Sequence, residues 1–558
     1  MEQIREGLEQ AICDLYSLND FDADLKPSPE NVPTDYSTNL PLKLTQTLHK
    51  SPMDIATEIA DYLTKNSLPQ ATITSPGFLN FVLPNAYLAS AVNRLSADFA
   101  SEISSTTYKG KTVICEFSDP NPFKVLHVGH LYTSVVGDSI SRLYEYAGAK
   151  VIRANFGGDV GLHVAKTMYA LLQKDTANLK IEDIANCYIE GTAAYDNDEA
   201  AKQEITRLNK EIYHINAKNL HNTPLAALYW RGRELSYEYF NDFYAKIGVH
   251  FDKYYPESTV AALGLATVKR ELENGIYEMS NGAVIFPGEK YNLHTRVFIN
   301  KEGVPTYEAK DVGLIFTKWQ DYHFDKSVVI TGNEQKDYMS VVLKSVEQYA
   351  PDLVEKTTHL THGLVKLPGN VKMSSRKGNF LKAVDVLNMV DAALKSEYNS
   401  TDPVISLAAT KYAFLKYKMG GDIIFDPKES VKMTGNSGPY LLYSAVRAKK
   451  ILQRTLPGKA ASSEGAFQPT NSTRPEEREL AKKLLEYKGI LQTSVAEMSP
   501  HKVANYLYEL AQDFSRFYEN CQVTGSDREA ERVELVQAYL NIMTHGLGIL
   551  GINIPEEM

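Results

Sequence analysis

The tetrapeptide His127-Val128-Gly129-His130 combines two imidazoles with a residue that has no side chain. It falls at the start of a long helical pattern, directly after an apolar strand and a proline-rich turn. A helix N-terminus at the carboxyl edge of a parallel sheet attracts phosphate, and imidazole N–H groups can donate to phosphate oxygens. Gly129 would let a flat base or ribose lie against the backbone. The pattern predicts a nucleotide site, against the simpler interpretation that both histidines only cap a helix.

A second pattern, KMSSRKG at 372–378, gathers positive charge in a segment that follows Pro368-Gly369. A cationic loop with small hydroxyl residues can close over a triphosphate and neutralise the charge that develops on a leaving group. Taken alone, a basic loop is as often a solvated surface. The histidine pair favours the first interpretation, because both patterns suit the same ligand.

The elements that must position these residues alternate between strand and helix. An apolar strand (112–117), a helix (127–146) and a second strand (150–156) have the spacing of a βαβ unit. Residues about 170 to 300 are largely helical and charged, which suits an insertion on a parallel-sheet domain. The run SVVITG, Ser327 to Gly332, then resumes the sheet.

The two ends of the chain differ from this central part. Residues 1–108 combine amphipathic helices with an alternating run that turns at Pro76-Gly77, which predicts a small α+β module. From about Ser400 nearly all periodicity is helical and predicts an α-helical bundle. A Ser/Gly/Pro-rich segment, 457–475, interrupts it. We therefore expect a multidomain α/β protein divided at 1–108, 109–385 and 386–558.

Composition excludes several classes of protein. The 558 residues carry a formal net charge of -10 and 43% apolar residues, as ordinary globular domains do. No run of eighteen apolar residues occurs, and the N-terminus lacks the pattern of a secretion signal. The cysteines are far apart, so we expect reduced core thiols in a cytoplasmic protein without zinc; they are Cys13, Cys115, Cys187 and Cys521. Net acidity disfavours indiscriminate coating of nucleic acid but allows a local basic surface.

The two chemical patterns together resemble the signatures of class I aminoacyl-tRNA synthetases, and the chain is similar to the arginyl-tRNA synthetase family over nearly its whole length. The similar segments include EFSDPNPFKVLHVGH, RANFGGDVG, YEAKDVG, GNVKMSSRKGN, GNSGPYLLYSAVRAKKIL, DYSTNLPLKL, PGFLNF and the final GINIPEEM. The resemblance implies a Rossmann-type catalytic domain. It also implies an arginine–tRNA ligase, which forms arginyl-adenylate from L-arginine and ATP and transfers arginine to the terminal ribose of tRNA(Arg), releasing AMP and pyrophosphate.

The resemblance assigns the arginine site to Glu116, Asn121, His127, Tyr307, Asp311 and Gln335. A guanidinium needs carboxylates and other acceptors in a matching plane. Tyr307 and Asp311 are four apart in a helical pattern, so both should project from one face. The simpler alternative for Asp311 is a surface charge paired with Lys310 or another neighbour. Glu116 ends a buried strand, where an unpaired carboxylate would be costly.

By the same resemblance, ATP would bind to His127, Gly129, His130, Gly332, Lys372, Met373 and Ser374. The residues expected to act in catalysis are His127, His130, Lys372, Arg376 and Lys377. Mg²⁺ would accompany ATP. Ser375 stands where the general class I loop has its second lysine, so the neighbouring Arg376 and Lys377 are the candidates to replace that charge.

The resemblance also implies partners. The C-terminal bundle would read the anticodon, the N-terminal module would touch the tRNA elbow, and the protein would be a monomer that needs bound tRNA for adenylate formation. Two alternatives stay open: a class I synthetase for another amino acid, such as cysteine or glutamate, and a tRNA-binding relative that has lost the ligase reaction. The run GLGILG at 546–551 fits G-x-G-x-x-G, but it lies in a helical pattern and reads as a helix end.

Overall fold

The computed structural model describes residues 2–19, 21, 23–28, 32, 34–369, 381–455, 466–470 and 473–558. The chain divides into two compact units. Unit 1 comprises Met1–Ile103, Ser444–Ile490 and Tyr508–Met543, and unit 2 comprises Ser104–Tyr443, Leu491–Leu507 and Thr544–Met558. The predicted cationic loop and much of the segment 457–475 lie outside the described residues.

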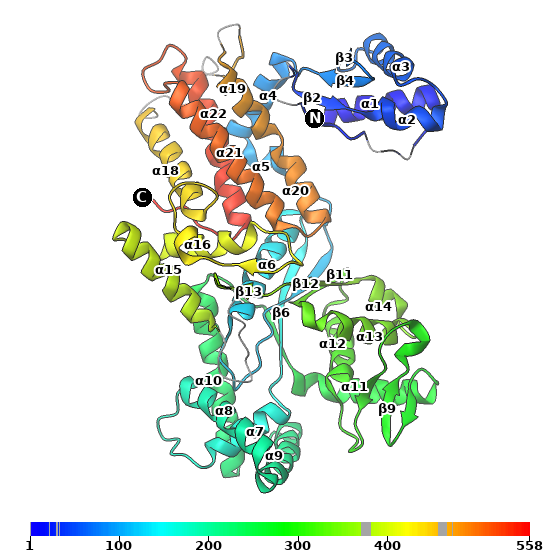
Figure 1. Cartoon of the computed structure of the whole chain (residues 1–558), viewed down its shortest axis with the longest axis vertical. Helices are drawn as coiled ribbons and strands as arrows, with labels where there is room; N and C mark the ends of the chain where they lie inside the picture. The colour runs from blue at the N-terminus through cyan, green and yellow to red at the C-terminus, as the bar shows by residue number, and fades with distance from the viewer. Residues whose placement is uncertain are drawn as a thin grey trace. The chain divides into compact units, whose positions relative to one another are not determined.

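Unit 2 is built on a parallel sheet of five strands (Figure 1). In chain order they are β5 (Thr112–Glu116), β6 (Lys150–Gly157), β7 (Lys253–Pro256), β11 (Lys326–Gly332) and β12 (Thr357–His362). Their order across the sheet is β12-β11-β5-β6-β7, and every neighbouring pair is parallel. This is the Rossmann order, with the topological switch point between β5 and β11. The predicted fold class is confirmed.

Helices cover this sheet and connect its strands. They are α6 (Val128–Tyr146), α12 (Tyr307–Tyr322), α13 (Lys336–Glu347) and α14 (Pro351–Glu355). The helix predicted over 127–146 is α6, and the strands predicted around it are β5 and β6. The apolar core beneath α12 and α13 includes Ile114, Val312, Val329 and Val342, each at most 3% exposed.

The segment 170–300 is largely helical, as predicted, but it is not one insertion. Only its first part, α7 (Leu162–Leu171), α8 (Ile181–Asn197), α9 (Glu199–Lys218) and α10 (Pro224–Lys246), is a helical cluster with a core of its own. β7 follows and belongs to the main sheet. After α11 (Glu257–Glu273) comes a small antiparallel sheet of β8 (Glu278–Ser280), β9 (Ala283–Phe286) and β10 (Arg296–Ile299). These strands are too short to show a clear period.

The rest of unit 2 lies C-terminal to the sheet. The parallel pair β13 (Val365–Lys366) and β14 (Ile423–Ile424) accompanies the helices α15 (Ala383–Tyr398), α16 (Pro403–Leu415) and α17 (Pro427–Ser430). The glycine-rich run at 546–551 is a helix end, as predicted, because α22 stops at Ile549 and Gly551 takes a φ of +67°.

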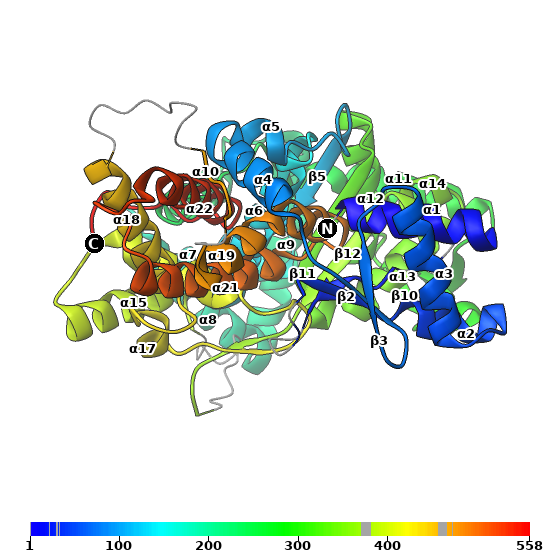
Figure 2. The ribbon, with the colours of Figure 1, turned by 90° about the horizontal axis from the view of Figure 1, so that it is seen from above.

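Unit 1 joins an N-terminal α+β segment to a helical bundle. The segment contains α1 (Glu2–Tyr16), α2 (Leu40–Leu48), α3 (Pro52–Lys65), α4 (Asn85–Ala97), α5 (Phe99–Ile103) and the antiparallel strands β1 (Lys26–Pro27), β2 (Tyr36–Thr38), β3 (Ala71–Thr74) and β4 (Phe78–Phe81). The turn predicted at Pro76-Gly77 joins β3 to β4. Most of the bundle helices α18 (Gly438–Thr455), α19 (Pro475–Leu485), α20 (Tyr487–Ala496), α21 (Pro500–Asn520) and α22 (Glu529–Ile549) belong to it. Figures 1 and 2 show α19, α21 and α22 side by side.

The four cysteines are free thiols, but one of them departs from the prediction of core thiols. Cys115, Cys187 and Cys521 are buried, whereas Cys13 is exposed on α1. Across the described part of the chain, no helix combines the length and the apolar character needed to span a membrane.

Candidate active site at the carboxyl edge of the parallel sheet

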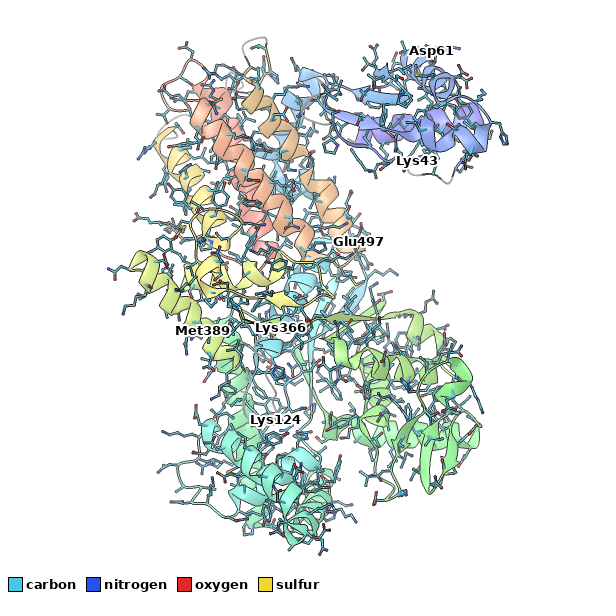
Figure 3. The ribbon with its side chains drawn as sticks, in the orientation of Figure 1. Lys43, Asp61, Lys124, Lys366, Met389 and Glu497 are labelled. Atoms are coloured by element: carbon cyan, nitrogen blue, oxygen red, sulfur yellow. The ribbon has the colours of Figure 1, made fainter. Side chains whose placement is uncertain are left out.

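A cavity of about 960 Å³ opens at the carboxyl edge of the parallel sheet of unit 2. Residues that end or follow all five strands line it: Glu116 and Asn121 after β5, Gly158 after β6, Glu257 after β7, Gly332 at the end of β11 and His362 at the end of β12. Ligands of doubly wound parallel sheets bind at this edge, beside the switch point. The N-terminus of α6 and Lys366 of β13 complete the wall; Lys366 is labelled in Figure 3.

The two motif histidines cap α6 reciprocally. Nδ1 of His127 accepts a hydrogen bond from the backbone N–H of Gly129, and Nδ1 of His130 accepts one from the backbone N–H of His127, each at 3.1 Å. The rings stack with centroids 3.7 Å apart. An Nδ1 atom that accepts carries no proton, so each neutral ring holds its proton on Nε2. The cap therefore fixes the tautomer that donates, and both histidines line the cavity.

Both rings are neutral at physiological pH. Burial and then the nearby charge of Lys124 lower the pKa of His127 to about 4. Burial and the adjacent His127 lower the pKa of His130 well below its ordinary value. The histidines can therefore hold phosphate oxygens as neutral donors, and the positive charge at this place comes from Lys124, labelled in Figure 3 on the segment between β5 and α6. Lys124 was not among the predicted site residues.

The predicted cationic loop, with Lys372, Met373, Ser374, Arg376 and Lys377, lies outside the described residues. Its C-terminal flank contacts the histidine motif directly. The backbone N–H of Val128 donates to the carbonyl of Leu381 at 2.9 Å, and the N–H of Ala383 donates to the carbonyl of Leu126 at 3.0 Å. On the N-terminal side, Val365 and Lys366 line the cavity. Both flanks of the loop thus begin at the cavity wall.

Glu116 lines the cavity at the end of β5, but its charge is already paired. Its Oε2 atom accepts a hydrogen bond from Nζ of Lys318 on α12 at 2.6 Å, and the two side chains are 3% and 1% exposed. A buried carboxylate needs such a partner. The sequence indicated that Glu116 should be paired without identifying Lys318. That lysine lies seven residues after Asp311 on one helix, a spacing that could have revealed it.

Asp311 and Tyr307 both line the cavity from the first turns of α12, as their spacing predicted. Asp311 is 8% exposed and accepts a hydrogen bond from the hydroxyl of Tyr338 on α13. Burial, partly opposed by that hydrogen bond, raises the pKa of Asp311 to about 8. The alternative pairing of Asp311 with Lys310 is excluded, because Nζ of Lys310 contacts Glu257 at 2.5 Å.

The remaining predicted residues also reach this cavity. Gln335 lines it from the short helix η2 (Asn333–Gln335), one turn after Gly332. Asn121 lines it too, and its Oδ1 atom accepts a hydrogen bond from the backbone N–H of Gly158 at 2.7 Å. A Cβ atom at Gly332 would lie 2.4 Å from the carboxylate end of the Glu334 side chain, which also lines the cavity. Every predicted site residue that the structure describes therefore lines one cavity.

Sequence reasoning missed a group of charged and aromatic residues in the same wall. They are Asp119, Glu257, Arg296, Glu308 and Tyr338. It also missed Lys318, which pairs with Glu116, and Lys124, whose charge acts on His127. Asp119 has a φ of +50°, and its Oδ1 atom accepts a hydrogen bond from the N–H of Phe156 at 2.7 Å. Burial and the adjacent Glu116 raise the pKa of Asp119 well above its ordinary value. The cavity thus combines two neutral imidazoles, which can donate hydrogen bonds to phosphate, at the start of α6 with carboxylates from other elements.

Three family models match successive parts of the chain. A family model described as tRNA synthetases class I (R), catalytic domain, matches residues 93–419, more than half of the chain. The DALR anticodon binding domain matches residues 441–558, and the arginyl tRNA synthetase N terminal domain matches residues 2–83. The chain belongs to the class I arginyl-tRNA synthetases.

Similarity to arginyl-tRNA synthetases extends over the full chain. The arginine–tRNA ligase of Treponema denticola is 28% identical over 585 aligned residues, which cover 99% of this chain and 97% of that protein. The arginine–tRNA ligase of Lactobacillus delbrueckii subsp. bulgaricus is 28% identical over 581 residues, covering 100% and 99%.

Solved structures of arginyl-tRNA synthetases share the fold. The Thermus thermophilus enzyme superposes with a TM-score of 0.79 at 23% identity, covering 100% of both chains. The Plasmodium falciparum enzyme gives a TM-score of 0.80 at 19% identity, covering 100% of this chain and 99% of that one. At these identities the likeness concerns the fold alone.

Proposed function

We propose that this chain is an arginine–tRNA ligase in which the cavity of unit 2 is the site of both reaction steps. It activates L-arginine with ATP to arginyl-adenylate, and it then transfers the arginyl group to the 3′-terminal ribose of tRNA(Arg). One observation carries the choice of amino acid: a buried carboxylate, Asp311, lies with Tyr307 and Gln335 in the cavity that holds the neutral histidine pair.

The acidic wall suits a guanidinium. Free arginine presents a planar, permanently charged group with five N–H donors. Asp311 is a desolvated acceptor whose ionisation would cost free energy in the empty cavity, and a bound guanidinium offsets that cost. Tyr307, 53% exposed at the start of α12, and Gln335 offer further polar contacts to the same group. The α-amino and carboxylate end of the bound arginine would then be oriented by Glu116, Asn121 and His127.

Activation needs alignment and no enzyme nucleophile. A carboxylate oxygen of arginine attacks the α-phosphorus of ATP, and the bond to the bridging oxygen breaks, so that pyrophosphate leaves with the electron pair. The Nε2–H groups of His127 and His130 would donate to phosphate oxygens whose charge grows in the transition state. Gly129 and Gly332 would leave the backbone open to ribose and base.

The departing pyrophosphate needs cations. We assign this role to Lys372, Arg376 and Lys377, with Met373 and Ser374 contacting ATP, because both described flanks of their loop begin at the cavity wall. Lys124 supplies an additional positive charge near the histidines.

Magnesium would enter with the nucleotide. Among the described residues no cluster of three or more His, Cys, Asp or Glu side chains is arranged to hold a metal ion. Phosphate oxygens and water would therefore be the principal ligands, as is usual for Mg²⁺ bound with ATP.

The second step requires tRNA. Residues 386–558 would bind the anticodon and residues 1–108 the tRNA elbow, with the catalytic part at 109–385; the matches to a DALR anticodon binding domain and to an arginyl tRNA synthetase N terminal domain support this division. The 2′-hydroxyl of the terminal ribose would be the first acceptor, as in class I enzymes. We further propose a cytoplasmic monomer that forms adenylate only with tRNA bound.

The test is ATP–pyrophosphate exchange with each of the twenty amino acids, with and without total tRNA. Exchange with arginine alone, dependent on tRNA, is expected. Exchange with cysteine or glutamate instead would refute the assignment of the guanidinium site, and tRNA binding without exchange would indicate a non-catalytic relative.

Removal of the metal provides a second arm of this test. Excess EDTA should abolish exchange and leave the thermal unfolding temperature unchanged, because the ion belongs to the nucleotide. A chelator-dependent fall in unfolding temperature would instead reveal a resident metal ion.

A further inference from the structure

Asp311 has a single hydrogen-bond donor among the residues that the structure describes. The hydroxyl of Tyr338, on α13, donates to its Oδ2 atom. Burial and the neighbouring Asp311 raise the pKa of Tyr338 well above its ordinary value, so the hydroxyl keeps its proton and stays the donor. One oxygen of the carboxylate is thus held by the protein, and Oδ1 is left without a donor from the described chain.

Tyr338 is itself fixed by a charged pair in the same wall. The guanidinium carbon of Arg296, on β10, lies 5.2 Å from the centre of the Tyr338 ring. Nη1 of Arg296 contacts Oε1 of Glu308 on α12 at 3.2 Å. All four side chains line the cavity. They come from β10, α12 and α13, which Figure 1 shows in green within one part of unit 2.

We propose that Tyr338 is a positioning residue for substrate recognition: held by Arg296 and Glu308, it directs the free oxygen of Asp311 at the substrate's guanidinium and favours the charged carboxylate there. This inference rests on the proposed function. Because burial raises its pKa to about 8, Asp311 is largely protonated in the empty cavity at pH 7. Binding of an arginine cation therefore ionises the carboxyl and releases its proton to solvent.

The surroundings of Asp311 support the direction of this change. Three other carboxylates lie in the same wall: Glu116 ends β5, Glu257 begins α11 and Glu308 lies on α12. Each already pairs with a cation, namely Lys318, Lys310 and Arg296 respectively. Asp119 follows β5, and burial with the adjacent Glu116 raises its pKa. A further cation is therefore needed for the ionised form of Asp311, and arginine brings one.

The test compares Tyr338→Phe with a matched control, Tyr255→Phe. Tyr255 is 2% exposed in the same unit, and its hydroxyl also donates to an aspartate, Asp321, at 3.0 Å, but neither residue lines the cavity. In tRNA-dependent exchange, Tyr338→Phe should raise KM for arginine about tenfold with kcat nearly unchanged, since one charge-assisted contact is disturbed. The control should leave both constants at the wild-type values.

The pH profile separates positioning from a structural role. The Tyr338 hydroxyl lowers the pKa of Asp311, so its removal raises that pKa in the free enzyme. The acid limb of kcat/KM for arginine should therefore move to higher pH in Tyr338→Phe and stay in place in Tyr255→Phe. A loss of activity with an unmoved limb would overturn the proposal.

Calorimetry of arginine binding gives a readout that needs no catalysis. Titrations in two buffers of different ionisation enthalpy should show release of close to one proton per arginine in the wild type at pH 7, given a pKa of about 8 for Asp311 in the empty cavity. Asp311→Asn should show no release. Exchange with arginine but no proton release would refute this inference and leave the proposed function intact, whereas no exchange with arginine would refute the function itself.

Discussion

At the scale of single residues, the cavity holds groups that destabilise the folded protein and are useful only with a ligand. Asp311 is a carboxyl whose pKa is raised to about 8 by burial. Its ionisation is easier in the unfolded chain, so above its ordinary pKa it lowers the free energy of unfolding. Binding sites typically contain groups of this kind, which reduce the stability of the ligand-free protein but bind the ligand.

The variant Asp311→Asn tests whether Asp311 reduces the stability of the protein while it recognises arginine. The variant keeps an acceptor for the Tyr338 hydroxyl and removes the charge, so kcat/KM for arginine should fall by about a hundredfold or more, as expected when one partner of a desolvated charge pair is lost. Its unfolding temperature at pH 7 should equal or exceed that of the wild type, because the amide has no ionisation that favours the unfolded chain, whereas burial holds the Asp311 carboxyl in its protonated form in the folded protein. Exchange kinetics and circular dichroism measure the two effects. Near-unchanged kcat/KM would contradict the assignment, and a lowered unfolding temperature would show that Asp311 is structural.

The sequence identified site residues that lie close to one another along the chain. It missed site residues that reach their partners only in the folded protein. The histidine pair and the Tyr307-Asp311 spacing are local patterns. Arg296 lies on β10, before α12, and Tyr338 lies on α13, after β11 and η2, so only the folded chain brings them to Asp311. Lys318 is an intermediate case. It lies seven residues after Asp311 on the same helix, so the sequence could have predicted that both share one helix face.

At the scale of elements, α6 links backbone geometry to chemistry. Its first residues use their own side chains as caps, so the hydrogen bonds that end the helix also set the tautomers of the site. A side chain at Gly129 would not fit without displacement of the His127 ring. A Cβ atom there would lie 2.8 Å from Cε1 and 2.9 Å from Nδ1 of His127.

Gly129→Ala should therefore displace the His127 ring and lower kcat/KM for ATP by about tenfold or more, because an oriented donor is lost. The fold should persist, since alanine suits a helix better than glycine. Gly548→Ala is the matched control: it is also a helical glycine of unit 2, with nothing within 4 Å of the added carbon, and it should retain full activity. Exchange at varied ATP measures the difference. If the two variants behave alike, the capping geometry is not needed for ATP binding.

Element prediction succeeded where length and period were strong. The nineteen-residue helix α6 and the eight-residue strand β6 show clear apolar patterns and were expected. β7 is only four residues, and β8 only three. Strands this short depend on pairing with distant strands rather than on their own pattern, because β-propensity is mostly packing against neighbours. The antiparallel sheet inside the predicted helical insertion was missed for that reason.

At the scale of the whole chain, sequence order and compact units disagree. Unit 1 combines residues from both ends of the chain, and buried charges hold them together. Asp35, 6% exposed, lies after β1, and it pairs with Arg478 at 2.6 Å and with Lys482 at 3.2 Å on α19. Contacts separated by more than four hundred residues leave no periodic signal. The sequence therefore indicated the α+β segment and the bundle separately, and could not indicate that they share one unit.

Unit 2 should lose stability in mild acid because it buries histidines in the neutral form. Burial lowers the pKa of His127, His359 and His545 to about 4 and that of His163 to about 3. Unfolded histidines titrate near 6.5. Between these values the unfolded forms of these histidines bind more protons than the folded forms, so they lower the free energy of unfolding as pH falls from about 6.5 to about 4. Asp119 and Asp311 oppose this fall, because burial raises their pKa values and they bind protons more readily in the folded protein.

The expected result is a fall in the unfolding temperature of roughly ten degrees between pH 7 and pH 5, measured by calorimetry at constant ionic strength. His545→Gln should make this pH dependence shallower, because one buried titrating ring is removed from its place beside Tyr146. The same change at His221, which is exposed, is the control and should leave the dependence as in the wild type. Equal dependence in all three proteins would mean that carboxyl groups, rather than buried imidazoles, determine the acid sensitivity of the fold that carries the site.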